Sequence, residues 1–222
     1  MNALQPLLAL DPRLPAAWAW VQAQMRPDAA HDDAHLARVA RWTIRCAPDQ
    51  PPALAVAAAL THDVVNLPKN HPDRAHASEL SAQAVLSQLP SLGFTPDDAR
   101  CIADAVRDHS YSRGATPINP LGRALQDADR LDALGALGVL RVAGVGGQLG
   151  RALMHPGDPW AEDRDPDDLA YTIDHFFTKL LRLDGTFLTP AGQAEARRRT
   201  LTMRAFLAEL ASELEIAPPQ QG

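Results

Sequence analysis

The stretch PALAVAAALTHD, residues 52–63, decides how this chain folds. Its run of alanine, leucine and valine is apolar on all sides, which is typical of a helix buried at the centre of a helical domain. Two prolines, Pro51 and Pro52, are suited to the start of this helix, which we expect over about residues 53–62. The helix ends on His62 and Asp63, two side chains that commonly bind metal ions.

The rest of the chain is also expected to be helical, because apolar positions recur every three to four residues and no strand-like alternation is seen. We expect one all-α domain over residues 15–216, between a lead of residues 1–14 and a disordered tail of residues 217–222. The glycine-rich residues 144–147 are expected to interrupt a helix, and residues 155–168 to form a long loop and candidate lid. The other expected helices cover residues 15–26, 33–46, 75–89, 96–109, 123–142, 166–183 and 190–216.

Composition narrows the class of protein. The 222 residues are 46% hydrophobic, enough for one domain with a sizeable core. The net charge of −6 argues against a nucleic-acid polymer as partner, because such binding needs a basic face. No leader-like N-terminus and no long apolar run is present, so we expect a cytoplasmic protein without membrane contact. The two cysteines, Cys46 and Cys101, lack CxxC spacing and are expected to be reduced core residues.

The His62–Asp63 pair needs partners from elsewhere to hold an ion. Adjacent helix residues point about 100° apart, so further ligands must come from other helices. His35 in HLARV and Asp129 in QDADRLD are such partners, and this mixed nitrogen and oxygen set suits Mn, Fe, Co, Ni, Mg or Zn. The pair taken alone has a second interpretation, in which His62 is a satisfied helix-terminal histidine and Asp63 a local cap.

The ordered set H…HD…D, with HxxRV at His35 and DADRLD at Asp129, resembles the HD-domain metal-dependent phosphohydrolase superfamily. Further segments are similar to the YpgQ/YedJ-like branch of small bacterial HD proteins: HDDAHLARV, ALTHDVVNLPKNHPDRAHAS, DHSYS, QDADRLDALGALGVLR and YTIDHFFTKLLRL. The resemblance covers roughly residues 15–212. It implies an all-α fold around one divalent ion, for which we favour Mn, with His35, His62, Asp63 and Asp129 as ligands.

The sequence gives weaker evidence for the residues that bind the substrate or transfer a proton. Lys69 and Arg74, in the loop after the metal pair, are candidate phosphate-binding residues, and His31 is either a cap neighbour or a polar residue at the mouth of the site. Val65 and Asn66 stand where many HD proteins have the Gly and Lys of HDxGK, so Lys69 is a substitute candidate. His109 in DHSYS is the candidate catalytic group; the alternatives are that it orients a metal ligand, binds phosphate or, with His76, holds a second metal ion, and we favour a single ion. The supporting residues are Arg38, expected to pair with Asp127 or Asp132, and Asp132 itself, expected with Asp108 and Asp127 to hold histidines or arginines in place.

The resemblance favours a nucleoside triphosphate pyrophosphohydrolase, which would release pyrophosphate and a nucleoside monophosphate. A 5′-nucleotidase or a cyclic-nucleotide phosphodiesterase would share the same four ligands. A third hypothesis is a sensor that binds metal and nucleotide without turnover. In every case we expect a small anionic partner that carries phosphate, and an amphipathic first or last helix leaves a homodimer open.

Overall fold

Helix α4 (Pro52–Thr61) is buried along its whole length from Ala53 to Thr61, as the apolar run predicts. The computed structural model describes residues 3–24, 33–67, 75–110 and 113–220. In these ranges the secondary structure is helical, and the one β feature is an isolated bridge between Ala152 and Tyr171. The all-α fold class is therefore confirmed.

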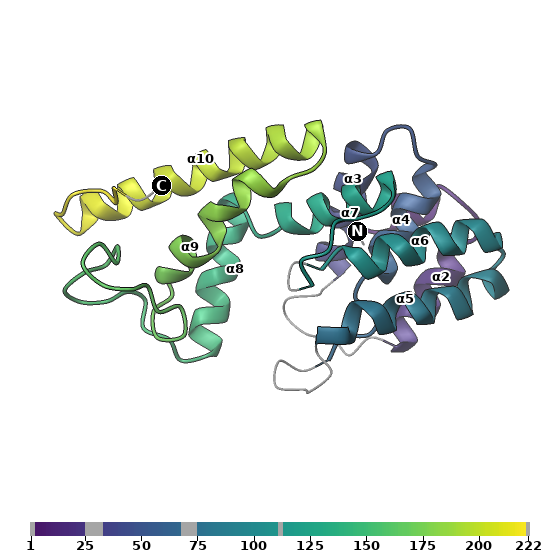
Figure 1. Ribbon diagram of the computed structural model, residues 1–222, viewed down its shortest axis with the longest axis horizontal. Helices are drawn as coiled ribbons and strands as arrows, with labels where there is room; N and C mark the ends of the chain where they lie inside the picture. Colours follow the sequence, from purple (N-terminus) through teal and green to yellow (C-terminus); the bar gives the residue numbers. More distant parts are fainter. Residues whose placement is uncertain (1–2, 25–32, 68–74, 111–112, 221–222) are drawn as a thin grey trace. The chain divides into compact units, whose positions relative to one another are not determined.

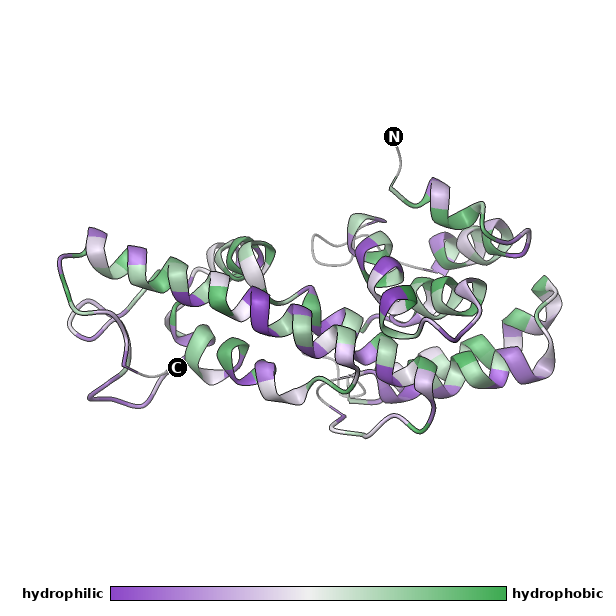
Figure 2. Ribbon diagram, turned by 90° about the horizontal axis from the view of Figure 1, so that it is seen from above, coloured by the Kyte–Doolittle hydropathy of each residue, from purple (hydrophilic) through white to green (hydrophobic). Residues whose placement is uncertain are grey.

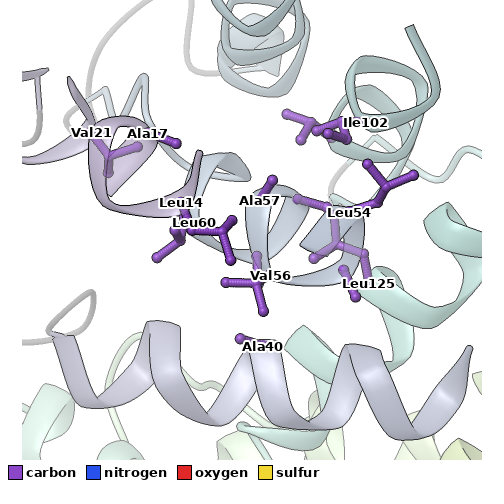
Figure 3. Close-up of a cluster of buried hydrophobic side chains, with 14 of the residues drawn as sticks. Leu14, Ala17, Val21, Ala40, Leu54, Val56, Ala57, Leu60, Ile102 and Leu125 are labelled. Atoms are coloured by element: carbon purple, nitrogen blue, oxygen red, sulfur yellow. The ribbon is translucent and has the colours of Figure 1, made fainter. Parts of the chain in front are cut away.

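Helix α4 forms the centre of its unit because α2 (Leu14–Gln24), α3 (Asp33–Cys46) and α6 (Pro96–Asp108) pack around it (Figure 1). Figure 3 shows how: Val56 points toward Ala40 of α3, Leu60 lies beside Leu14 of α2, and Leu54 lies near Ile102 of α6. These side chains are almost fully buried. The small alanines on α4 let the neighbouring helices approach closely, so the core around α4 is densely packed.

The remaining helices of this part follow in chain order. Helix α1 (Gln5–Leu8) lies in the expected lead, and Leu7 and Leu8 of this helix, with Leu4 directly before it, belong to the core. Helix α5 (Ala77–Gln88) continues into the 3-10 helix η2 (Leu89–Leu92) and packs on α6. Helix α6 begins with a capping box, in which the Thr95 hydroxyl accepts a hydrogen bond from the Asp98 N–H. Helix α7 (Pro120–Leu131) completes the set.

Contacts divide the chain into two compact units, Met1–Asp129 with Leu188–Gly192, and Arg130–Phe187 with Gln193–Gly222. The second unit contains α8 (Gly135–Gln148), α9 (Asp174–Thr178), the 3-10 helix η3 (Leu180–Thr186) and most of α10 (Pro190–Glu213). Polar and apolar segments alternate along α10 (Figure 2). None of the described helices is long and apolar enough to cross a membrane.

The prediction of one helix over residues 123–142 with a break at residues 144–147 is wrong. The chain leaves the helical path between α7 and α8, and Gly135, the first residue of α8, adopts a φ of +75°. Glycines 144, 146 and 147 lie inside α8. Gly146 is required by close packing, because a Cβ there would lie 2.2 Å from the Thr172 hydroxyl oxygen.

The prediction of a helix over residues 166–183 is also too long, since only α9 and η3 are helical there. Residues 155–168 form irregular structure, as expected, and a buried ion pair fixes them: Asp174 is fully buried and accepts two hydrogen bonds from Arg164. Residues 217–220, expected to belong to a disordered tail, carry two hydrogen bonds: Trp160 donates to the Ala217 carbonyl, and the Gln220 N–H donates to Glu162.

Candidate metal centre

Four helix ends supply the side chains of the candidate metal centre, and all four lie in the first unit. His35 lies in the first turn of α3, and His62 and Asp63 directly follow α4. His109 directly follows α6, and Asp129 lies in the last turn of α7. The buried core around α4 therefore fixes the origin of every one of these side chains, which is what a preorganised site requires.

The two histidines of the predicted ligand set face each other through their Nε2 atoms, 3.4 Å apart. His62 Nδ1 lies 2.8 Å from the Ala59 carbonyl oxygen, which can only accept, so Nδ1 carries the proton and Nε2 the lone pair. Both rings are buried, with His62 fully inaccessible. A hydrogen bond from the far nitrogen of the ring is the usual way in which a protein orients a metal-binding imidazole.

The two carboxylates lie beside this pair. Asp129 Oδ1 is 3.7 Å from His35 Nε2 and 3.9 Å from His62 Nε2, while Asp63 Oδ2 is 3.6 Å from His62 Nε2. These separations are too long for hydrogen bonds. They are the separations expected of neighbouring ligands on one ion, because coordination bonds of about 2.0–2.2 Å leave adjacent ligand atoms about 3 to 4 Å apart.

His109 lies on the other side of Asp63. Its Nδ1 donates to the Val106 carbonyl at 2.7 Å, so its Nε2 faces the site, 3.6 Å from Asp63 Oδ1. Its ring meets the His62 ring edge-on, with centroids 5.0 Å apart. His109 thus contacts two members of the predicted ligand set at once.

Burial and neighbouring charge separate the pKa values of these histidines. Burial lowers the pKa of His62 to about 4, although Asp63 opposes this effect, so His62 is neutral at pH 7 and offers its lone pair. Burial would also lower the pKa of His109, but the adjacent Asp63 carboxylate and the charge of Asp129 outweigh it, and the pKa is raised. One imidazole is therefore suited to bind a cation, and the other to hold a proton.

The donor atoms fit one divalent cation. Among the described residues, two groups have ligand atoms close enough to hold an ion, His35–His62–Asp129 and His62–Asp63–His109, and both include His62. His62 has one available nitrogen, so the two groups describe a single centre rather than two independent ones. Two imidazole nitrogens with two carboxylate oxygens suit a borderline divalent metal ion.

Of the other predicted site residues, three lie outside the described residues: His31, Lys69 and Arg74. Arg38 is half-buried, one turn after His35 on α3. Asp132 binds Arg141 at 2.7 Å, and Asp108 forms a forked pair with Arg107, so both hold arginines.

Asp127 attaches the segment that leads into α10 to helix α7. Its carboxylate accepts hydrogen bonds from the Leu188 and Thr189 N–H groups and from the Thr189 hydroxyl. Sequence reasoning also missed Gln126, a fully buried amide on α7, because no motif spacing distinguishes it.

Comparisons with known proteins agree with this geometry. The family model of the HD domain matches residues 33–134, which include all five residues of the centre. The protein YpgQ of Bacillus subtilis is 32% identical over 202 residues, which cover 88% of this chain and 90% of YpgQ. The structure of YpgQ in complex with ADP has a TM-score of 0.71 at 28% identity, and covers 96% of this chain and 97% of that one.

A second solved structure, of an HD-superfamily hydrolase from Bacillus thuringiensis, has a TM-score of 0.69 at 26% identity, with 93% and 98% of the two chains covered. The similarity thus extends over nearly the whole length of both relatives. This chain therefore belongs to the HD-domain family, the superfamily of metal-dependent phosphohydrolases.

Proposed function

We propose that this protein is a nucleoside triphosphate pyrophosphohydrolase that uses one divalent ion, with Mn²⁺ favoured. The observation that carries the proposal is the convergence of two buried histidines, His35 and His62, with two partly exposed carboxylates, Asp63 and Asp129, at one point, with the His109 Nε2 beside it. The similarity to YpgQ, whose structure was solved with ADP, supports a nucleotide as the substrate.

In this proposal His35, His62, Asp63 and Asp129 hold the ion. A bound divalent ion supplies Lewis acidity, because it polarises a phosphoryl oxygen and lowers the pKa of an adjacent water molecule. His109 has a raised pKa and faces Asp63, so its Nε2 can hold or pass a proton at the reacting phosphate. The dense packing behind these residues fixes their positions before substrate arrives.

The charges of the centre indicate what else the substrate needs. Two carboxylates with two neutral imidazoles balance the charge of a divalent ion, so the ligand set has little charge left to offset a triphosphate. Cationic side chains must do this, and Lys69, Arg74 and His31 are proposed for that role because they are close in sequence to the ligands.

Phosphorus NMR of the purified protein with Mn²⁺ and a panel of nucleoside mono- and triphosphates tests this function. The proposal predicts pyrophosphate and a nucleoside monophosphate from triphosphates, and loss of this activity in Asp63→Asn but not in the control Asp98→Asn, a partly exposed residue of the α6 capping box. Orthophosphate from monophosphates alone would identify a nucleotidase instead. Nucleotide binding without turnover in the metal-loaded wild type would favour the sensor and overturn the proposal.

A further inference from the structure

One buried amide joins two parts of the metal centre. Gln126 lies on α7 one turn before Asp129, and only 2% of its surface is exposed. Its Nε2 donates to two backbone carbonyls, of Asp108 at 3.1 Å and of Ala115 at 3.3 Å. Gln126 therefore binds the chain on both sides of the segment that follows α6, from the helix that carries a predicted metal ligand.

The first of these carbonyls belongs to the residue that precedes His109. The His109 ring is otherwise held by its own Nδ1, which binds the Val106 carbonyl in the last turn of α6. The direction of its Nε2 toward Asp63 thus depends on where the backbone at residues 108–109 lies. A buried carbonyl that loses its donor is left without a partner at a cost in free energy, so the Gln126 bonds restrain this backbone.

The side-chain amide of Asn119, the residue directly before α7, provides a comparison. Asn119 donates to the Cys101 carbonyl at 3.0 Å and accepts from the Gly122 N–H at 2.7 Å. It makes the same kind of side-chain to backbone bonds, in the turn that enters α7. Its partners are not adjacent to any residue of the metal centre.

We propose that Gln126 is a positioning residue of the metal centre. By holding the Asp108 carbonyl, it fixes the His109 ring relative to Asp129, and His109 in turn contacts the His62 ring and the Asp63 carboxylate. Loss of the Gln126 amide frees His109 and, through it, two of the predicted metal ligands. Only the consequence for turnover rests on the proposed function.

The test compares Gln126→Met, which keeps length and removes the donor, with Asn119→Leu as the matched control. The loss of a hydrogen bond that orients the residues of a metal site typically changes metal affinity or activity by about 10–100-fold. We expect Gln126→Met to raise the Kd for Mn²⁺, measured by electron paramagnetic resonance, at least about tenfold, and to shift the His109 ring ¹⁵N signals of the metal-free protein. Asn119→Leu should lower the melting temperature and leave both readouts unchanged. A Gln126→Met protein that is merely less stable, with wild-type Mn²⁺ affinity and His109 signals, would overturn the proposal.

Should Gln126→Met fail to fold, the wild-type protein still provides a test. The side-chain amide signals of Gln126 should shift during a Mg²⁺ titration with the same Kd as the His109 ring signals, and signals that stay fixed at saturation would overturn the proposal. With nucleotide, Gln126→Met should lower kcat and leave KM nearly unchanged. Absence of turnover in the wild type would contradict the proposed function, while the Mn²⁺ and NMR readouts would still decide the role of Gln126.

Discussion

Asp127 should be among the most important residues for stability in the first unit, although it does not belong to the metal centre. Its carboxylate is fully buried and accepts hydrogen bonds from the Leu188 N–H at 2.9 Å, the Thr189 N–H at 2.7 Å and the Thr189 hydroxyl at 2.7 Å. These bonds attach the backbone that leads into α10 to α7. Because the acceptor is charged and buried, each bond contributes more than a neutral surface bond would.

We predict that Asp127→Asn lowers the free energy of unfolding by about 2–4 kcal/mol. Whichever way the new amide turns, its NH₂ group must face a backbone N–H, so at least one buried donor is left unsatisfied at about 1–3 kcal/mol, and the charge assistance is lost as well. Asp98→Asn is the control, because Asp98 serves a partly exposed capping box and should cost at most about 1 kcal/mol.

The assay is equilibrium unfolding of the metal-free proteins in urea, followed by both far-ultraviolet circular dichroism and tryptophan fluorescence. Coincidence of the two transitions checks that a single free energy describes the change. If Asp127→Asn were no less stable than Asp98→Asn, the assignment of Asp127 as the buried attachment of the α10 entry would be refuted.

Three further predictions concern stability and its pH dependence. Gly192→Ala should cost about 1–3 kcal/mol in urea unfolding, because the new Cβ would lie 2.3 Å from Asp127 Oδ2; wild-type stability would contradict this packing. In the metal-free protein, His62 keeps a pKa of about 4 against 6.5 ordinarily, so only the unfolded chain takes up a proton between these values. The free energy of unfolding should therefore fall by about 2–3 kcal/mol from pH 6.5 to 4, and His62→Gln should flatten this fall; an unchanged profile would show that His62 is not buried neutral. Hydrogen bonds from Arg198 and Arg199 lower the pKa of Glu195 to about 2. The Glu195 carboxylate therefore contributes to the free energy of unfolding above pH 4.5, and this contribution is lost as the pH falls toward 2. Glu195→Gln should cost about 1 kcal/mol at pH 7 and nothing at pH 2, as melting temperatures at both pH values can check.

The sequence was most informative where one local pattern determined one element. The apolar run of residues 53–61 could only be satisfied by burial on all sides, and α4 is buried along this length. The ligand set His35, His62, Asp63 and Asp129 was indicated by the ordered motif H…HD…D, although Asp129 was expected inside a helix and lies near the end of one. The helices that carry these residues pack around one core, and their ends therefore bring the four side chains close together.

Glycine was misread because its function depends on neighbours that are distant in sequence. Gly138 and Gly146 lie inside α8 and remove clashes, with the Ala133 carbonyl and with Thr172 respectively, whereas Gly135 supplies the turn. A single sequence does not distinguish a glycine that breaks a helix from one that allows close packing.

The hydrogen bonds of Asp127 and Gln126 could not be predicted from the sequence. Asp127 finds its partners 61 and 62 residues later, and Gln126 binds a carbonyl 18 residues earlier. Neighbouring positions on one helix thus point to different segments of the chain, and only the tertiary fold reveals which.

We propose that His35, His62, Asp63 and Asp129 form one metal centre. Electron spin-echo measurements on Mn²⁺ bound to protein with ¹⁵N-labelled histidine test it most directly. We predict one Mn²⁺ per chain coupled to two histidine nitrogens, one coupling fewer in His35→Gln, and at least about 100-fold weaker binding in the Asp63→Ala and Asp129→Ala double variant. Mn²⁺ that binds without histidine coupling, or equally well to the double variant, would contradict the account.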